Sequence, residues 1–476
     1  MLKSAFALLA FVAAPAVGSP QSTTLRGGPT AQPLSAAEVA KIDQLVTTTL
    51  ADTGVPSAEI AVVRGGQIVL NKAYGKASET LKARTDLPYQ IASNSKQFTA
   101  MALILLEDEG KLSLDDKVAK YFPDISGADR ITIRQLLSHT SGLQDFWPLD
   151  YSFAAMAKPV APQAIVDRWA KKPLDYDPGD QCQFSNTGYV VAGMIAEKVS
   201  GEPLVKFLKR KIFDPLHMTS VLDQDAALGS KFPTGYGRYA LGPVRVVTPP
   251  ASGWLYAAGE LSMTAEDLAK WDIARLNRSL IPAEDWAEQE TPIKLNNGTD
   301  TGYGLGVGIG QRNGHKSISH TGEAVGFLSA NYVYPEDKAA VVVLTNSWSG
   351  NAYTRIARGI TNIVLPPAAQ DSDAVAAQAK ARTVFDQLRS GKLDRSLLTE
   401  NANYYFTQQA IADYASSLAT LGEPVSFEPS GKPILRGGFV IQGYTIKYPA
   451  KTLDLSTFYE PGGTGRIEQF LITEDE

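Results

Sequence analysis

A serine and a lysine three residues apart, Ser93 and Lys96, have the types and spacing needed for acyl transfer. On a helix, residues at this spacing lie on one face about one turn apart. The segment from Phe98 to Leu106 is apolar almost all round, which predicts a buried helix. Burial and the positive end of the helix dipole both favour a neutral lysine amine, which can accept the serine proton. The pair therefore predicts a nucleophile, Ser93, and its proton acceptor, Lys96.

The same spacing has a plainer explanation, in which Ser93 only caps the helix and Lys96 is a solvated side chain of its first turn. Serine is a favoured N-cap residue, so the spacing alone does not decide. Two observations favour the chemical interpretation. The pair is the single Ser-x-x-Lys of the chain, and three further segments downstream could complete a site around it.

These segments are residues 131–143, with Leu-Leu-Ser-His139-Thr-Ser-Gly, residues 178–189, with Phe184-Ser-Asn186, and residues 317–327, with His320-Thr321-Gly322. Together with Ser93-x-x-Lys96 they resemble the active-site elements of the penicillin-recognising serine hydrolases. The nearest group within that family comprises class C β-lactamases, D-alanyl-D-alanine carboxypeptidases, D-aminopeptidases and related esterases. The resemblance runs over roughly residues 35–365, with the motifs in the family's order.

The resemblance implies a role for each matching residue. Ser93 would be the acylated nucleophile, Lys96 its activating partner, and Asn186 a hydrogen-bonding partner of the substrate amide. A strand beside the acyl group would bind a substrate carboxylate or carbonyl through His320, Thr321 and Gly322. The backbone amides of Ser93 and Glu323 would form the oxyanion hole.

Two positions need separate comment. His139 matches a hallmark of the family that is not catalytic, so we expect it to be structural. Phe184 stands where the family carries the tyrosine of Tyr-x-Asn, and a phenyl ring can neither donate nor accept a proton. In the resembling enzymes that hydroxyl works with the lysine, and general acid–base catalysis typically contributes 10²-fold to 10⁴-fold.

Two functions therefore remain open. The first is a serine hydrolase that forms an acyl-enzyme on Ser93 from a small amide or ester, of the D-amino-acid peptide, ester or β-lactam class. The second is a catalytically weakened or inactive member that serves as a ligand-binding or regulatory module, with Phe184 as the lesion. We favour the first, because Ser93, Lys96, Asn186 and His320 are all present.

Composition restricts the classes of partner and ligand that the protein could bind. The formal net charge is −5 and no basic run is present, which argues against nucleic acid. The single cysteine, Cys182, excludes an intrachain disulfide, and we expect its thiol to be buried. The spacing of the four histidines predicts no metal site, and we expect no cofactor. The partner should be a small-molecule or peptide substrate, and a homodimer remains an option.

The order of segments along the chain predicts two domains behind a cleaved leader. Residues 1–18 read as a signal peptide, so we expect an exported protein, periplasmic or secreted, without a membrane span. A linker follows at 19–34. A hydrolase domain at 35–367 should precede a small α+β accessory domain at 373–476, for which a fold like that of nuclear transport factor 2 is one candidate.

The hydrolase domain should be of the α/β (α+β) class. Two β-branched runs, 58–64 and 67–73, flank Gly65-Gly66 and predict a hairpin, as do 329–334 and 339–345 near the other end. A mostly helical section lies between these hairpins. The resemblance implies a β-lactamase/transpeptidase-like fold, in which helices and an all-helical section flank an antiparallel sheet.

Overall fold

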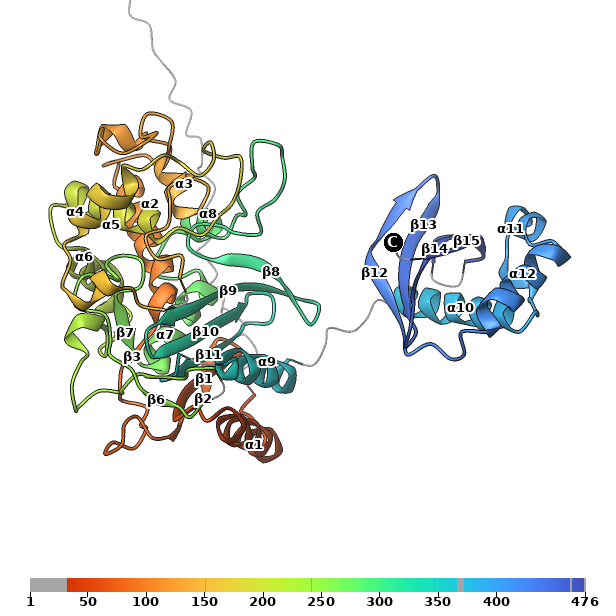
Figure 1. The fold of residues 1–476 in the computed structure, drawn as a ribbon, viewed down its shortest axis with the longest axis horizontal. Coiled ribbons are helices and arrows are strands. Elements are labelled where there is room, and N and C mark those ends of the chain that lie inside the picture. Colours follow the sequence, from red (N-terminus) through yellow and green to blue (C-terminus); the bar gives the residue numbers. More distant parts are fainter. Residues whose placement is uncertain are drawn as a thin grey trace, which may run out of the picture. The chain divides into compact units, whose positions relative to one another are not determined.

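The computed structural model describes residues 32–149, 151–240, 242–348, 350–365, 372–462 and 465–474. The predicted signal peptide and most of the predicted linker lie outside these residues. The described residues form two compact units, one made of those up to Ile309 together with Ile318–Ala357, the other of Gly310–Ser317 together with those from Arg358 onward (Figure 1). None of the described helices is both long and apolar enough to cross a membrane.

The main sheet has six strands in the order β2-β1-β11-β10-β9-β8. Its central strands β1, β10 and β11 are buried along almost their whole length, which requires cover on both faces. Both predicted hairpins are present in it, and β1 pairs antiparallel with β11, so the two ends of this sequence region meet. The bounds are β1 Ser57–Arg64, β2 Gln67–Gly75, β8 Gly308–Arg312, β9 His315–Ala324, β10 Phe327–Tyr334 and β11 Ala339–Thr345.

Helices pack against this sheet and form the section between the hairpins. The first helix begins with the capping box that Ser35 and Glu38 predict, and α7 packs against β1 and β11. The buried helix predicted after Ser93 is α2, all but a few of whose side chains are inaccessible to solvent. The bounds are α1 Ala36–Thr53, α2 Lys96–Asp108, α3 Ile133–Leu137, α4 Pro162–Ile165, α5 Asn186–Ser200, α6 Leu204–Leu208, α7 Ala265–Asn277, α8 Ala283–Gln289 and α9 Ala352–Val364.

Short strands complete the first unit. A three-stranded sheet in the order β3-β7-β4 lies next to the turn that carries Ser93, and a two-stranded ribbon pairs β5 with β6. The bounds are β3 Tyr89–Gln90, β4 Leu222–Asp223, β5 Tyr236–Gly237, β6 Arg245–Val246 and β7 Leu261–Met263.

The second unit is a four-stranded antiparallel meander, β12-β13-β14-β15, packed on one long helix. The unit contains both helices and strands, as an α+β unit should. Its outer strands have weak sequence signals, because Pro429, Gly431 and Pro433 interrupt β12 and β15 contains Glu468 and Glu474. The bounds are α10 Ser372–Arg389, α11 Glu400–Tyr405, α12 Gln408–Ala419, β12 Ser426–Arg436, β13 Phe439–Lys447, β14 Thr452–Tyr459 and β15 Ile467–Glu474.

Candidate active site

Ser93 lies in a single 3₁₀ turn, Ala92–Ser95, immediately before α2. The preceding residue, Ala92, has φ +49°, a left-handed conformation that is unfavourable for a residue with a Cβ atom. The turn is held in place from β10, because Ser329 Oγ donates to the Ile91 carbonyl at 2.8 Å and accepts from Asn94 at 2.8 Å. Such local strain with firm support is typical of a functional turn.

The Ser93 side chain does not cap the helix. The residue at the N-cap position of α2 is Ser95, and no side chain there bonds to the first turn. The Ser93 Oγ instead lies 2.9 Å from Lys96 Nζ. The structure thus removes the capping explanation for this pair and leaves the contact between hydroxyl and amine.

Lys96 is fully buried, with its Nζ surrounded by three oxygen atoms. Besides Ser93 Oγ, these are Asn186 Oδ1 at 2.9 Å and the carbonyl oxygen of Ala258 at 2.7 Å. The amide and carbonyl oxygens can only accept, so a neutral amine donates its two N–H groups to them. Its lone pair then remains for the Ser93 hydroxyl, which becomes the donor. This is the geometry of a base poised on a nucleophile.

Burial also supplies the required protonation state. It lowers the pKa of Lys96 to about 7, against the opposing effect of the Asp145 carboxylate. A large share of the amine is therefore neutral near pH 7, as a general base must be.

The pH dependence of acylation should follow this amine. Because the protonated amine cannot take the serine proton, kcat/KM is expected to fall about tenfold per pH unit below pH 7 and to level off above about pH 8. The p-nitrophenyl acetate reaction measures this cleanly, since that ester has no titratable group in the range. A profile that is flat from pH 5.5 to 7.5 would show that Lys96 is not the base.

Asn186 is the first residue of α5, and Asp145 fixes its orientation. The Asn186 backbone N–H donates to Asp145 Oδ1 at 3.1 Å, and its side-chain Nδ2 donates to Oδ2 at 3.3 Å. This leaves Asn186 Oδ1 pointing to Lys96. The neighbouring Ser185 side chain caps α5 by accepting from Gly188 N–H, so its hydroxyl is engaged in the helix start.

Phe184 lies beside the lysine at the predicted position. The centre of its ring is 4.6 Å from Lys96 Nζ, and 44 % of the residue is exposed to solvent. It also packs against the buried His139 ring, with the ring centres 4.3 Å apart. His139 Nδ1 accepts from the Ser185 N–H at 3.1 Å, which agrees with a structural role. Tyr189, the other tyrosine of this segment, is buried and donates to the Leu137 carbonyl.

The third motif lies on β9, next to the Ser93 turn. Gly322 packs against this turn so closely that a Cβ atom there would stand 2.0 Å from the Ile91 carbonyl oxygen. His320 Nδ1 contacts the Thr321 carbonyl, which only accepts, so Nδ1 carries the proton. Nε2 then accepts from the Tyr303 hydroxyl at 2.9 Å. Burial lowers the pKa of His320 to about 3, so the ring is neutral with both nitrogens engaged.

These side chains open into one cavity of about 450 Å³. The predicted residues Ser93, Phe184, Asn186, His320, Thr321 and Glu323 all line it. Lys96 is buried behind Ser93 and contacts its hydroxyl, and Gly322 packs against the turn that carries Ser93. Trp348 donates from its indole nitrogen to the Glu323 carboxylate at the rim. The other lining residues are Asp145, Trp147, Pro148, Leu149, Gln183, Leu255, Ala258, Trp348 and Tyr353.

Comparison with known proteins places this geometry in a family. The sequence profile described as Beta-lactamase matches residues 42–363. The chain belongs to the Beta-lactamase family. The fold is that of the β-lactamase/transpeptidase group, with an additional C-terminal unit, and the family consists of serine hydrolases.

Two curated relatives show the range of this family. The chain is 29 % identical to penicillin-binding protein 4* of Bacillus subtilis over 331 residues, which span 65 % of this chain and 72 % of that protein. It is 28 % identical over 320 residues to protein flp of Staphylococcus aureus, spanning 64 % of this chain and 62 % of that protein. The chain thus spans less than two thirds of the length of protein flp.

Solved structures of the Beta-lactamase family give the same result. A D-stereospecific amidohydrolase from Streptomyces sp. has a TM-score of 0.59 at 26 % identity, covering 69 % of this chain and 99 % of its own. The D-amino acid amidase of Ochrobactrum anthropi has a TM-score of 0.60 at 25 % identity, covering 69 % and 98 %. An octameric penicillin-binding protein homologue from Pyrococcus abyssi shares the fold, with a TM-score of 0.60 at 23 % identity, covering 92 % and 96 %.

Sequence reasoning missed two residues of this site, and one prediction was wrong. Asp145 and Tyr303 act on Asn186 and His320 from segments with no recognisable pattern, so only the fold could reveal them.

The prediction that Cys182 is buried was wrong, because it lies on an exposed loop with its thiol near the Ser138 carbonyl. Among the described residues, no cluster of three or more His, Cys, Asp or Glu could hold a metal ion.

Proposed function

We propose that this protein hydrolyses small amides or esters of amino acids through an acyl-enzyme on Ser93. The contact between Lys96 Nζ and Ser93 Oγ carries this proposal. It joins the only Ser-x-x-Lys of the chain to a buried amine whose pKa of about 7 suits a general base. Membership of a serine hydrolase family supports the same reaction class.

In the first half-reaction, neutral Lys96 takes the Ser93 proton as Oγ attacks the substrate carbonyl carbon. The backbone N–H groups of Ser93 and Glu323 are the proposed donors to the resulting oxyanion. The ammonium of Lys96 then protonates the leaving amine or alcohol, the bond to the leaving group breaks, and the acyl group remains on Ser93. Asn186, oriented by Asp145, holds the lysine and faces the substrate.

In the second half-reaction, Lys96 is neutral again and takes a proton from an incoming water. The hydroxide adds to the acyl carbonyl, and the tetrahedral intermediate collapses with release of the acid. The proton on Lys96 returns to Ser93 Oγ, which restores the starting state. Phe184 cannot take part in these proton transfers, so Lys96 both accepts and donates the proton in each half-reaction.

The charges around the cavity favour a substrate with a free amine. The described residues that line it include two carboxylates, Asp145 and Glu323, and neither arginine nor lysine. The Asp145 carboxylate accepts from Asn186 and Trp147. The Glu323 carboxylate accepts from Trp348 and is exposed at the rim. A substrate carboxylate would meet like charge here, and an α-ammonium group would meet opposite charge. We therefore propose amino-acid amides or esters in preference to β-lactams, in keeping with the amidases among the structural neighbours.

A comparison of substrates tests this proposal. D-phenylalanine amide should be hydrolysed at least about tenfold more efficiently than its N-acetyl derivative, because a charge-assisted contact contributes about 1.5–3 kcal/mol. Glu323→Gln should remove most of this difference by lowering kcat/KM for the free-amine substrate alone. Glu336→Gln, on an exposed turn away from the cavity, is the matched control.

Equal rates for both amides in the wild type would contradict the amine preference. Faster hydrolysis of benzylpenicillin than of either amide would contradict the proposed substrate class. The L-enantiomer of the amide, measured in parallel, reports whether the cavity selects the D configuration that the neighbours' names indicate.

We also propose that the protein is exported, on the strength of residues 1–18 alone. N-terminal sequencing of the protein recovered from outside the cytoplasm should begin after Gly18. Retention of the first residues in the mature protein would contradict this.

A further inference from the structure

The four-stranded sheet of the C-terminal unit has one covered face and one open face. Side chains of α10 pack with Tyr444, Ile446 and Leu455 on the covered face. Residues paired across neighbouring strands share a face, and so do residues two apart on one strand. The pairs Arg436–Phe439, Ile441–Phe458 and Phe458–Gln469 therefore place all of these side chains on the other face, with Leu471 next along β15.

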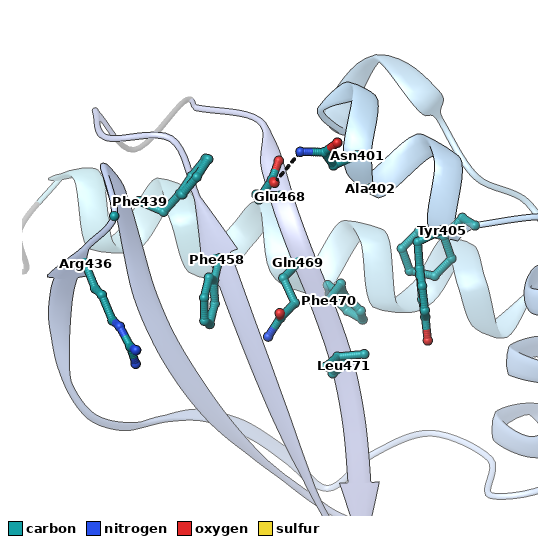
Figure 2. Close-up of a pocket in the computed structure, with 12 residues that line it drawn as sticks. Asn401, Ala402, Tyr405, Arg436, Phe439, Phe458, Glu468, Gln469, Phe470 and Leu471 are labelled. Atoms are coloured by element: carbon teal, nitrogen blue, oxygen red, sulfur yellow. Dashed lines mark hydrogen bonds between the residues drawn. The ribbon is translucent and has the colours of Figure 1, made fainter.

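Large apolar side chains of this open face are accessible to solvent. Phe439 and Phe458 are only partly buried and Leu471 is 38 % exposed, while Tyr405 at the end of α11 is 50 % exposed. Figure 2 shows these side chains around one hollow between the sheet and α11. The cavity measures about 690 Å³, which lies in the size range of small-molecule sites.

The two charged side chains of this cavity differ in whether their hydrogen-bonding groups are already used. Of the described residues that line it, Arg436 and Glu468 are the charged ones. The Glu468 carboxylate already accepts from Thr399 Oγ1 at 2.6 Å. It also accepts from Asn401 Nδ2 at 2.8 Å (Figure 2). Arg436 is exposed, and its guanidinium forms no hydrogen bond or ion pair with any described residue. One guanidinium with its hydrogen-bonding groups unused thus lies at the edge of an aromatic floor.

We propose that this cavity binds a small amphipathic carboxylate, with the carboxylate on Arg436 and an alkyl or aryl body on Phe439 and Phe458. The planar guanidinium fits a carboxylate through two parallel hydrogen bonds. The single cation matches a ligand with one negative charge, and the exposed rings gain free energy when an apolar body covers them. The site is independent of Ser93 and of the proposed hydrolysis.

Calorimetric titration of the full-length protein with decanoate, below its micelle concentration, tests this. We expect one saturable site, about tenfold weaker for octanoate because two methylene groups are lost. Decylammonium, of the same length and opposite charge, should not bind measurably. All six tryptophans precede residue 349, so their fluorescence reports any decanoate in the Ser93 cavity separately.

Arg436→Gln should weaken decanoate binding at least about tenfold, since a charge-assisted contact is lost. Gln469→Glu adds a negative charge to the cavity and should also weaken it. Lys447→Gln removes a positive charge from the same sheet outside the cavity and should change nothing. The proposal is overturned if decanoate does not bind, if decylammonium binds equally well, or if Arg436→Gln binds as the wild type does.

Discussion

Replacing Lys96 with methionine is expected to lower kcat/KM by about 10³-fold or more. The substitution keeps an unbranched side chain in a fully buried position but removes the one amine in contact with Ser93 Oγ. General-base catalysis typically contributes 10²-fold to 10⁴-fold, and here the same amine also protonates the leaving group. Steady-state kinetics with D-phenylalanine amide and p-nitrophenyl acetate measure the effect.

Folding has to be checked in this variant, because Asn186 Oδ1 and the Ala258 carbonyl each lose a donor. Unchanged circular dichroism and a cooperative melting transition would exclude unfolding as the cause. Lys206→Met, on an exposed face of α6, is the matched control and should keep full activity. If Lys96→Met retained more than about a tenth of the wild-type kcat/KM, the lysine would not be the base.

Phe184→Tyr is expected to raise kcat by about 10²-fold, the lower end of the range for one acid–base group. The centre of the ring already lies 4.6 Å from Lys96 Nζ, and the residue lines the cavity and is 44 % exposed to solvent. A hydroxyl on this ring would add a proton carrier between the lysine and the leaving group. Phe184→Leu, which adds no hydroxyl, should show no gain.

This substitution also separates the two functions that the sequence left open. A wild type that turns over slowly and gains activity on Phe184→Tyr is a working but weakened hydrolase. A wild type that binds substrate without turnover and becomes active on the same change would be a binding or regulatory module. If the wild type already matched the activity of the Phe184→Tyr variant, the missing hydroxyl would not be a lesion.

Much of the fold was predictable because its signals are local. The β-branched runs on either side of Gly65-Gly66 predicted the first hairpin, and residues 329–334 and 339–345 predicted the second. Other elements have weak sequence signals. Prolines and a glycine interrupt the strand pattern of β12, and the strand accommodates them through an irregularity in its pairing after Ser430.

The site was predictable where a motif carries it, and hidden where contacts come from distant segments. The structure brings Ser93, Lys96 and Asn186 together as the resemblance implied, and places Phe184 beside them. The Asp145–Asn186 contact joins residues 41 apart through backbone and side-chain geometry, which no spacing rule encodes. Protonation could be anticipated only in direction, since the pKa of Lys96 depends on how completely the fold buries it.

Intact-protein mass spectrometry gives the most direct test of Ser93 as the nucleophile. After incubation with a fluorophosphonate, the wild type should gain one adduct, located by fragmentation on Ser93, and Ser93→Ala should gain none. Labelling should fall below pH 7, in step with protonation of Lys96. An unlabelled wild type, or equal labelling of wild type and Ser93→Ala, would contradict the assignment of the acyl-transfer site.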